Sequence, residues 1–135
     1  MIMKTVECDC NHCKQMCYGR SCWGTITQIK KIIDAGYGNK LMLDYYSFND
    51  RNIDILVPAM VGYEEGRAPF WPEGKCSMLD KNDLCILHDK GLKPIEGKLA
   101  SCKNTDNFID HENFAKHWDT IRGQYLIENW CKTYF

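Results

Sequence analysis

Cysteine is the residue that most constrains what this chain can fold into. Nine of its 135 residues are cysteines, and five of the nine stand among the first 22 residues. The odd number, and the lack of an apolar leader after Met1, disfavour a disulfide framework formed in an oxidising compartment. Clustered thiols in a reducing compartment usually bind metal or carry out redox chemistry. We therefore expect a cytoplasmic, metal-binding protein, with redox thiols as the alternative.

The composition leaves room for an ordinary hydrophobic core. Hydrophobic residues make up 44% of the chain, and the formal net charge is -1. This balance disfavours a nucleic-acid partner, because such binders normally carry a basic excess. No apolar run approaches the roughly 20 residues of a membrane-spanning helix, so we expect no membrane partner. Without a repeat, linker or low-complexity tract, residues 1–135 are expected to form a single domain.

The first cysteine block has the spacing of a metal-binding knuckle. Two residues separate Cys10 from Cys13, and Cys17 and Cys22 follow shortly after. Two thiolates at the closer spacing can reach one ion from a tight turn. A thioredoxin-like motif would instead follow a strand and begin a helix, without so many thiols around it. Cys8 is one residue from Cys10, a step that rarely places both thiols on one ion, so we expect it not to be a ligand.

The second cysteine block consists of Cys76, Cys85 and Cys102. Residues 80–83 are polar and predict a hairpin turn with Cys76 on its first arm and Cys85 on its second. The block has no second CxxC knuckle, which disfavours a zinc ribbon. Thiolates from distant segments suit either a zinc site closed by the tertiary structure or an iron–sulfur cluster. His88 is either a further ligand or a loop histidine that bonds the backbone.

The other cysteine and histidine side chains are expected to have structural or surface roles. Cys131 follows Trp130 in an apolar helical pattern, so we expect it in the core. His12 is expected to be exposed, and His111 and His117 to have surface or capping roles. The candidate metal ligands are therefore seven thiols: Cys10, Cys13, Cys17, Cys22, Cys76, Cys85 and Cys102.

The first half of the chain predicts helices and one strand. Thr25 to Gln28 form a capping box, a stripe of isoleucines follows, and Gly36 is placed to end the helix. Residues 37–46 predict a turn and then a short helix. Residues 52–58 alternate apolar and polar side chains and predict a strand that ends at Pro58. Residues 62–74 are rich in glycine and proline and predict a loop.

The C-terminal segment predicts one long helix, from about Asp110 to Tyr134. Asp110 can cap it, and one apolar stripe runs along it through Phe114, Trp118, Ile121 and Tyr125. Together these elements predict a small α+β fold that is stapled by metal. It would comprise an N-terminal cysteine loop, helices, a short β-hairpin and a long C-terminal helix.

These motifs resemble the zinc- or iron-chelating cysteine-cluster (YkgJ-like) family. The resemblance covers about residues 8–102 and is closest to a branch that shares the segments 34–38 and 91–102. It implies metal chelation and implies no known reaction. The motifs that carry it are Cys10-x2-Cys13-x3-Cys17, the helix after Cys22-Trp23, Cys76-Ser77-Met78-Leu79, Cys85-Ile86-Leu87-His88 and Cys102.

Several functions are compatible with this cysteine set. Seven thiolates exceed the four ligands of one site, so the chain could hold one cluster with spare thiols or two ions. An iron–sulfur cluster ([4Fe-4S]) and Zn²⁺ both accept cysteine ligands. We expect a structural or metal-handling role. The alternatives are an enzyme that uses the centre for redox or radical chemistry on a peptide or small molecule, and a zinc-stabilised module that binds a protein or peptide. Phe70-Trp71-Pro72 could be the exposed contact of such a module, but we expect this segment to be a buried lid over the metal.

Overall fold

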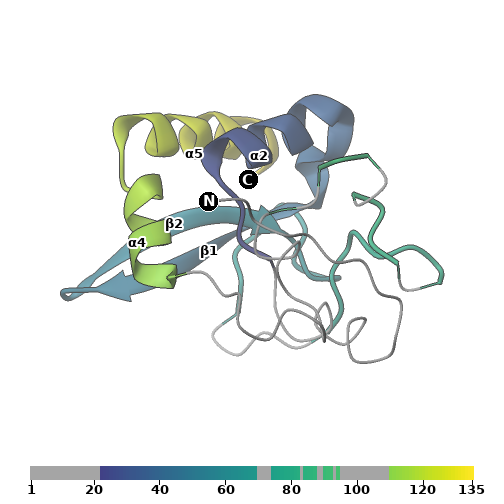
Figure 1. The fold of residues 1–135 in the computed structure, drawn as a ribbon, viewed down its shortest axis with the longest axis horizontal. Helices are drawn as coiled ribbons and strands as arrows, with labels where there is room; N and C mark the ends of the chain where they lie inside the picture. The colour runs from purple at the N-terminus through teal and green to yellow at the C-terminus, as the bar shows by residue number, and fades with distance from the viewer. Residues whose placement is uncertain (1–21, 70–73, 83, 88–89, 93, 95–109) are drawn as a thin grey trace, which may run out of the picture.

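The computed structural model describes residues 22–69, 74–82, 84–87, 90–92, 94 and 110–135 (Figure 1). These residues form an α+β fold, as the sequence predicts. None of the helices in these ranges is long and apolar enough to cross a membrane. The elements are α2 (Ile26–Ile32), the π turn η1 (Ile33–Tyr37), the 3-10 turn η2 (Gly38–Lys40), β1 (Leu41–Phe48), β2 (Arg51–Pro58), α4 (His111–Trp118) and α5 (Ile121–Tyr134).

Strands β1 and β2 pair antiparallel across a two-residue turn. Their register runs from Leu41 opposite Pro58 to Phe48 opposite Arg51. The turn residues Asn49 and Asp50 have φ angles of 47° and 63°. Positive φ at both central residues is typical of the tight hairpin turns whose twist matches that of the flanking strands. The predicted strand at residues 52–58 is therefore confirmed as the second arm of a hairpin.

The predicted short helix within residues 37–46 is wrong, because residues 41–48 form strand β1. Leu41, Met42 and Leu43 are consecutive in the sequence and all buried. An apolar run of this length has no period that distinguishes a strand covered on both faces from a buried helix. Pairing with β2, the next strand along the chain, decides the conformation.

Helix α2 begins where its sequence predicts. The Thr25 hydroxyl oxygen accepts a hydrogen bond from the Gln28 N–H at 3.1 Å, and the Gln28 side chain accepts one from the Thr25 N–H at 3.0 Å. This reciprocal pair is the predicted capping box. Ile29 and Ile32 are completely buried in the core. Gly36 adopts a φ of 98° within η1, a left-handed conformation that ends the helical path.

The prediction of one long C-terminal helix is wrong, because the chain turns between α4 and α5. Asp110 caps α4 as predicted, and its side chain accepts a hydrogen bond from the first turn. Thr120 begins a second helix, with its hydroxyl oxygen accepting from the Gly123 N–H at 3.1 Å. A Cβ atom on Gly123 would lie 2.3 Å from the carbonyl oxygen of Trp118. Glycine is therefore what permits this close turn.

The turn between the helices changes which C-terminal side chains are buried. Of the predicted stripe, Trp118 is fully buried, whereas Ile121 is 92% exposed and Tyr125 is 66% exposed. Helix α5 starts in a new direction, so the helical period does not continue from α4. Its buried face carries Gly123, Ile127 and Trp130 instead.

Two tryptophans attach the C-terminal helices to earlier parts of the chain. The indole nitrogen of Trp118 donates to the carbonyl oxygen of Gly24 at 3.1 Å, and that of Trp130 donates to Gly38 at 2.8 Å. Both rings are buried, where an indole N–H needs such a partner. As a result, α2 and α5 run side by side along the hairpin, and α4 packs across both strands near their turn (Figure 1).

The predicted loop at residues 62–74 also contacts the sheet where the structure describes it. The Leu43 N–H donates to the carbonyl oxygen of Gly66 at 2.9 Å, and the Ala68 N–H donates to that of Leu43 at 2.7 Å. The Arg67 guanidinium lies 3.1 Å from the Asp54 carboxylate. This segment therefore extends the pairing of β1 on the edge that β2 does not use.

Candidate metal centre

The structure describes three of the seven candidate ligands, namely Cys22, Cys76 and Cys85. Cys22 and Cys85 are partly buried, and Cys76 is buried. The other four candidates lie outside the described residues: Cys10, Cys13, Cys17 and Cys102. The predictions for Cys8, His12, His88 and Phe70-Trp71-Pro72 concern residues outside that part as well.

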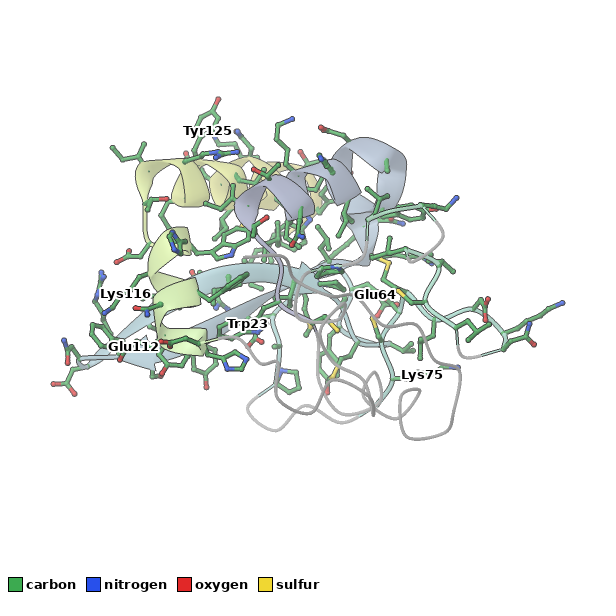
Figure 2. All side chains as sticks on the ribbon, viewed as in Figure 1. Trp23, Glu64, Lys75, Glu112, Lys116 and Tyr125 are labelled. Carbon is green, nitrogen blue, oxygen red and sulfur yellow. The ribbon has the colours of Figure 1, made fainter. Side chains whose placement is uncertain are left out.

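Cys22 is held in place by its neighbour Trp23. The Trp23 ring is only 8% exposed, and its indole nitrogen donates to the Asp44 carboxylate of β1 at 3.3 Å. The His111 ring of α4 meets this ring at nearly a right angle, with centroids 4.7 Å apart. Figure 2 shows Trp23 between the hairpin and α4. The point at which the first cysteine block joins the fold is therefore anchored to both β1 and α4.

Cys76 is tied to the end of β2. The Val61 N–H donates to the carbonyl oxygen of Lys75 at 2.9 Å, and the Ser77 N–H donates to that of Ala59 at 2.7 Å. The Cys76 sulfur accepts a hydrogen bond from the N–H of Met78, with the two atoms 3.5 Å apart. A backbone N–H aimed at sulfur stabilises its thiolate form, which is the form that binds metal. Cys76 is thus a core residue whose sulfur contacts a backbone donor.

The turn predicted at residues 80–83 is confirmed in the part that the structure describes. Leu79 and Cys85 form an antiparallel bridge, and the Asp80 N–H donates to the Leu84 carbonyl oxygen at 2.9 Å. The Asp80 carboxylate accepts from the N–H groups of Asn82 at 2.7 Å and Leu84 at 3.1 Å. In the described part, a single β-bridge joins the two arms, which do not form regular strands. They hold Cys85 across the turn from the segment that carries Cys76.

Gly24, two residues after Cys22, lies against Pro94, which stands between Cys85 and Cys102 in the sequence. A Cβ atom on Gly24 would lie 3.1 Å from the Cβ of Pro94, which is itself buried. Pro94 follows a turn in which the Leu92 N–H donates to the Leu87 carbonyl oxygen at 3.0 Å. The chain just after Cys22 therefore lies against the chain that follows Cys85.

The described residues do not complete a metal site by themselves. Among them, no three His, Cys, Asp or Glu side chains are grouped so that they could hold an ion. A cysteine-held zinc ion or cluster has about four protein ligands. Any complete centre therefore needs ligands from the candidates outside the described residues.

Cys131, His111 and His117 are not among the candidate metal ligands. The Cys131 thiol is partly buried and packs against the core, as predicted. Burial raises its pKa, the nearby Asp54 carboxylate raises it further, and Arg67 lowers it. His117 is exposed, as the sequence predicts. His111 is more than a surface residue, because its ring packs on Trp23.

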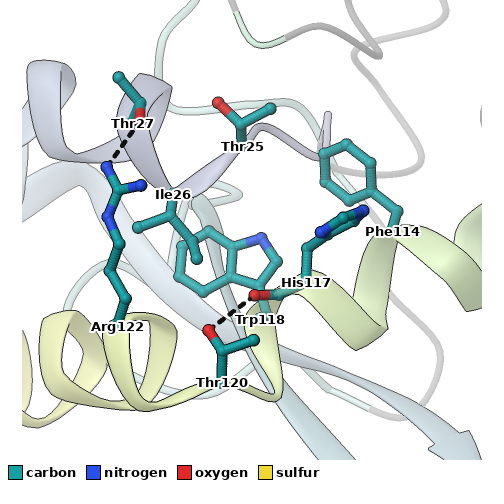
Figure 3. Close-up of a pocket in the computed structure, with 8 residues that line it drawn as sticks. All are labelled: Thr25, Ile26, Thr27, Phe114, His117, Trp118, Thr120 and Arg122. Carbon is teal, nitrogen blue, oxygen red and sulfur yellow. Dashed lines mark hydrogen bonds between the residues drawn. The ribbon is translucent and has the colours of Figure 1, made fainter.

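The sequence does not predict a pocket that lies between the start of α2 and the corner of α4 and α5 (Figure 3). Its volume is about 370 Å³. One wall is built by Thr25, Ile26 and Thr27, and the other by residues of α4 and α5. A hydrogen bond across it joins Thr27 to Arg122, which are 95 residues apart in sequence. Sequence patterns report neighbours within a few residues, so they have no signal for such a pocket.

Comparison of the chain with protein-family models, with curated proteins and with solved structures finds no match. The resemblance to the cysteine-cluster family therefore stays a prediction from the motifs.

Proposed function

We propose that this chain is a metal-binding protein whose two cysteine blocks share one centre. The supporting observation is the contact of Gly24 with Pro94, which sets the chain after Cys22 beside the chain after Cys85. Sulfur ligands lie only about 2.3 Å from zinc, so a shared centre requires the two blocks to be close. The proposed ligands come from the candidate set Cys10, Cys13, Cys17, Cys22, Cys76, Cys85 and Cys102.

The proposed role of the centre is structural or metal-handling. In cysteine sites the free energy of metal binding is folding free energy, on the order of 10 kcal/mol for structural zinc. A centre shared by the two blocks would hold the N-terminal segment against the hairpin that carries Cys76 and Cys85. The N–H of Met78 that points at the Cys76 sulfur supports thiolate ligation there. An all-cysteine donor set suits both [4Fe-4S] and Zn²⁺.

Metal analysis of cysteine variants tests this proposal. The protein is purified without oxygen, and its iron, zinc and acid-labile sulfide are measured together with its melting temperature. We expect Cys13→Ser and Cys85→Ser each to lose metal and to melt at a much lower temperature. A brown protein with labile sulfide would identify the cluster, and a colourless protein with stoichiometric zinc would identify the ion.

Cys131→Ser is the matched control, because this thiol packs against the core and lies outside the proposed ligand set. It should keep both its metal and its melting temperature. Full metal content in Cys85→Ser would contradict a centre joined from both blocks. Absence of stoichiometric metal from the wild-type protein would contradict the proposal as a whole.

A further inference from the structure

The pocket of Figure 3 carries a positive charge that no described carboxylate neutralises. The Arg122 guanidinium donates to the Thr27 hydroxyl at 2.8 Å and makes no ion pair with a described residue. The structure describes two other arginines, Arg51 and Arg67, and each pairs with an aspartate. None of the described residues that line the pocket is Asp or Glu. The guanidinium is therefore available to an anion that enters the pocket.

The middle of the pocket is apolar. Ile26, Phe114 and the fully buried Trp118 line it, and Figure 3 shows Arg122 and His117 on opposite sides of Ile26. Its volume of about 370 Å³ lies at the lower end of the roughly 300–1,000 Å³ usual for ligand sites. An apolar lining of this size suits a ligand with one ring or a short branched chain.

Hydroxyl groups add neutral donors to the wall formed by α2. The Thr25 hydroxyl oxygen accepts from the Gln28 N–H, and the Thr27 hydroxyl oxygen accepts from Arg122. Each of these bonds occupies an oxygen lone pair and leaves the hydroxyl hydrogen to donate. A planar guanidinium binds a carboxylate with two parallel hydrogen bonds. Hydroxyl groups can donate further hydrogen bonds to the same carboxylate oxygens.

We propose that this pocket binds a small organic carboxylate with an apolar body. Arg122 takes the carboxylate, and the partly exposed side chains of Ile26 and Phe114 contact the body, with the buried Trp118 ring behind them. The inference rests on the pocket alone and holds whether or not the cysteines bind metal. It adds a ligand-binding site on the side of the fold where α2 meets the α4–α5 corner.

An NMR titration of the full chain, with its metal as purified, tests the proposal. The probes are phenylacetate, its neutral isostere phenylacetamide, and inorganic phosphate. The reporters are the indole N–H of Trp118 and the methyl groups of Ile26, which both line the pocket. We expect saturable shifts with phenylacetate, with a Kd of roughly millimolar order as is usual for so small a ligand. Phenylacetamide and phosphate should bind at least about 10-fold more weakly, because each lacks one of the two recognised parts.

Variants of the helix charges separate recognition from general charge attraction. Arg122→Gln should weaken phenylacetate binding about 10-fold or more, and Arg122→Lys should retain part of it. The matched control is Lys132→Gln, which removes an exposed charge of the same sign near the other end of α5. It should leave the Kd unchanged. Equal binding of phenylacetamide or phosphate, equal binding by Arg122→Gln at an unchanged melting temperature, or no saturable shift with phenylacetate would each overturn the proposal.

Discussion

At the scale of single residues, the neighbouring groups give the cysteines of this chain different chemical properties, and the Cys131 thiol is one example. Burial and the Asp54 carboxylate raise its pKa, whereas Arg67 lowers it. The folded chain therefore keeps the Cys131 proton to higher pH than the unfolded chain does. The free energy of unfolding therefore falls as the pH rises from the pKa of the unfolded thiol to the raised pKa of the folded one, and it is unaffected by this thiol at lower pH. The Cys76 sulfur has a different contact, because it accepts a hydrogen bond from the N–H of Met78.

The first prediction follows from the causes of the Cys131 pKa shift. Asp54→Asn should move the pH profile of Cys131 alkylation to lower pH, because a raising charge is removed while Arg67 remains. The rate of modification by iodoacetamide is measured by mass spectrometry of the peptide that carries Cys131. Glu128→Gln, which removes an exposed carboxylate of α5, is the control and should leave the profile in place. A shift to higher pH in Asp54→Asn would show that the assigned cause is wrong.

At the scale of elements, the turn between Cys76 and Cys85 depends on one carboxylate. Asp80 accepts hydrogen bonds from the N–H groups of Asn82 and Leu84, and so closes the hairpin. Hydrogen bonds to a charged acceptor contribute about 1.5–3 kcal/mol each, less where water competes. The relative position of the two thiols therefore rests on local chemistry that a single substitution can remove.

We expect Asp80→Ala to lower the free energy of unfolding by roughly 1–2 kcal/mol, as for the loss of a helix cap. It should also lower the metal content, since the proposed centre needs both thiols in position. Asp80→Asn keeps one acceptor oxygen and should restore most of the stability. Urea unfolding and metal analysis measure the two effects, with Lys81→Ala as the exposed neighbouring control. Wild-type values for Asp80→Ala in both measurements would refute the role of this turn.

At the scale of the whole molecule, the hydrophobic core draws on every helix and strand that the structure describes. Among the described candidate ligands, Cys76 belongs to it and Cys85 packs against it. Completely buried side chains in the core include Ile29, Ile55 and Trp118. Most of the buried core side chains come from α2, the hairpin, α4 and α5, and the segments around the described cysteines add Trp23, Met78 and Leu87. The proposed centre would add stability to a core that is already closed.

Removal of the metal should therefore loosen the molecule without unfolding it. We expect the chelated and reduced protein to keep most of its helical far-UV circular dichroism. Its melting temperature should fall by about 10 °C or more, since each 1 kcal/mol shifts it by several degrees in a domain of this size. Re-addition of the metal should reverse the change. Loss of the helical signal on chelation would show that the core itself requires the centre, and an unchanged melting temperature would exclude a structural role.

The sequence by itself determined the features that depend on neighbours a few residues apart. The Thr25–Gln28 capping box, the cap at Asp110 and the turn at residues 80–83 all appear where their patterns predict. The atoms that form these features are close along the chain, so the residue types alone select the conformation. Cysteine spacing likewise indicated the candidate ligands, although most of them lie outside the described residues.

Only the tertiary structure decided the features that depend on contacts between separate elements. Strand β1 is a strand because β2 pairs with it, and the helical period breaks at Thr120 because Gly123 lets α5 approach Trp118 closely. The contact of Gly24 with Pro94 and the pocket at Arg122 arise in the same way. In each case the deciding free energy comes from packing and pairing between separate elements, which overrides the weaker preference of the local sequence.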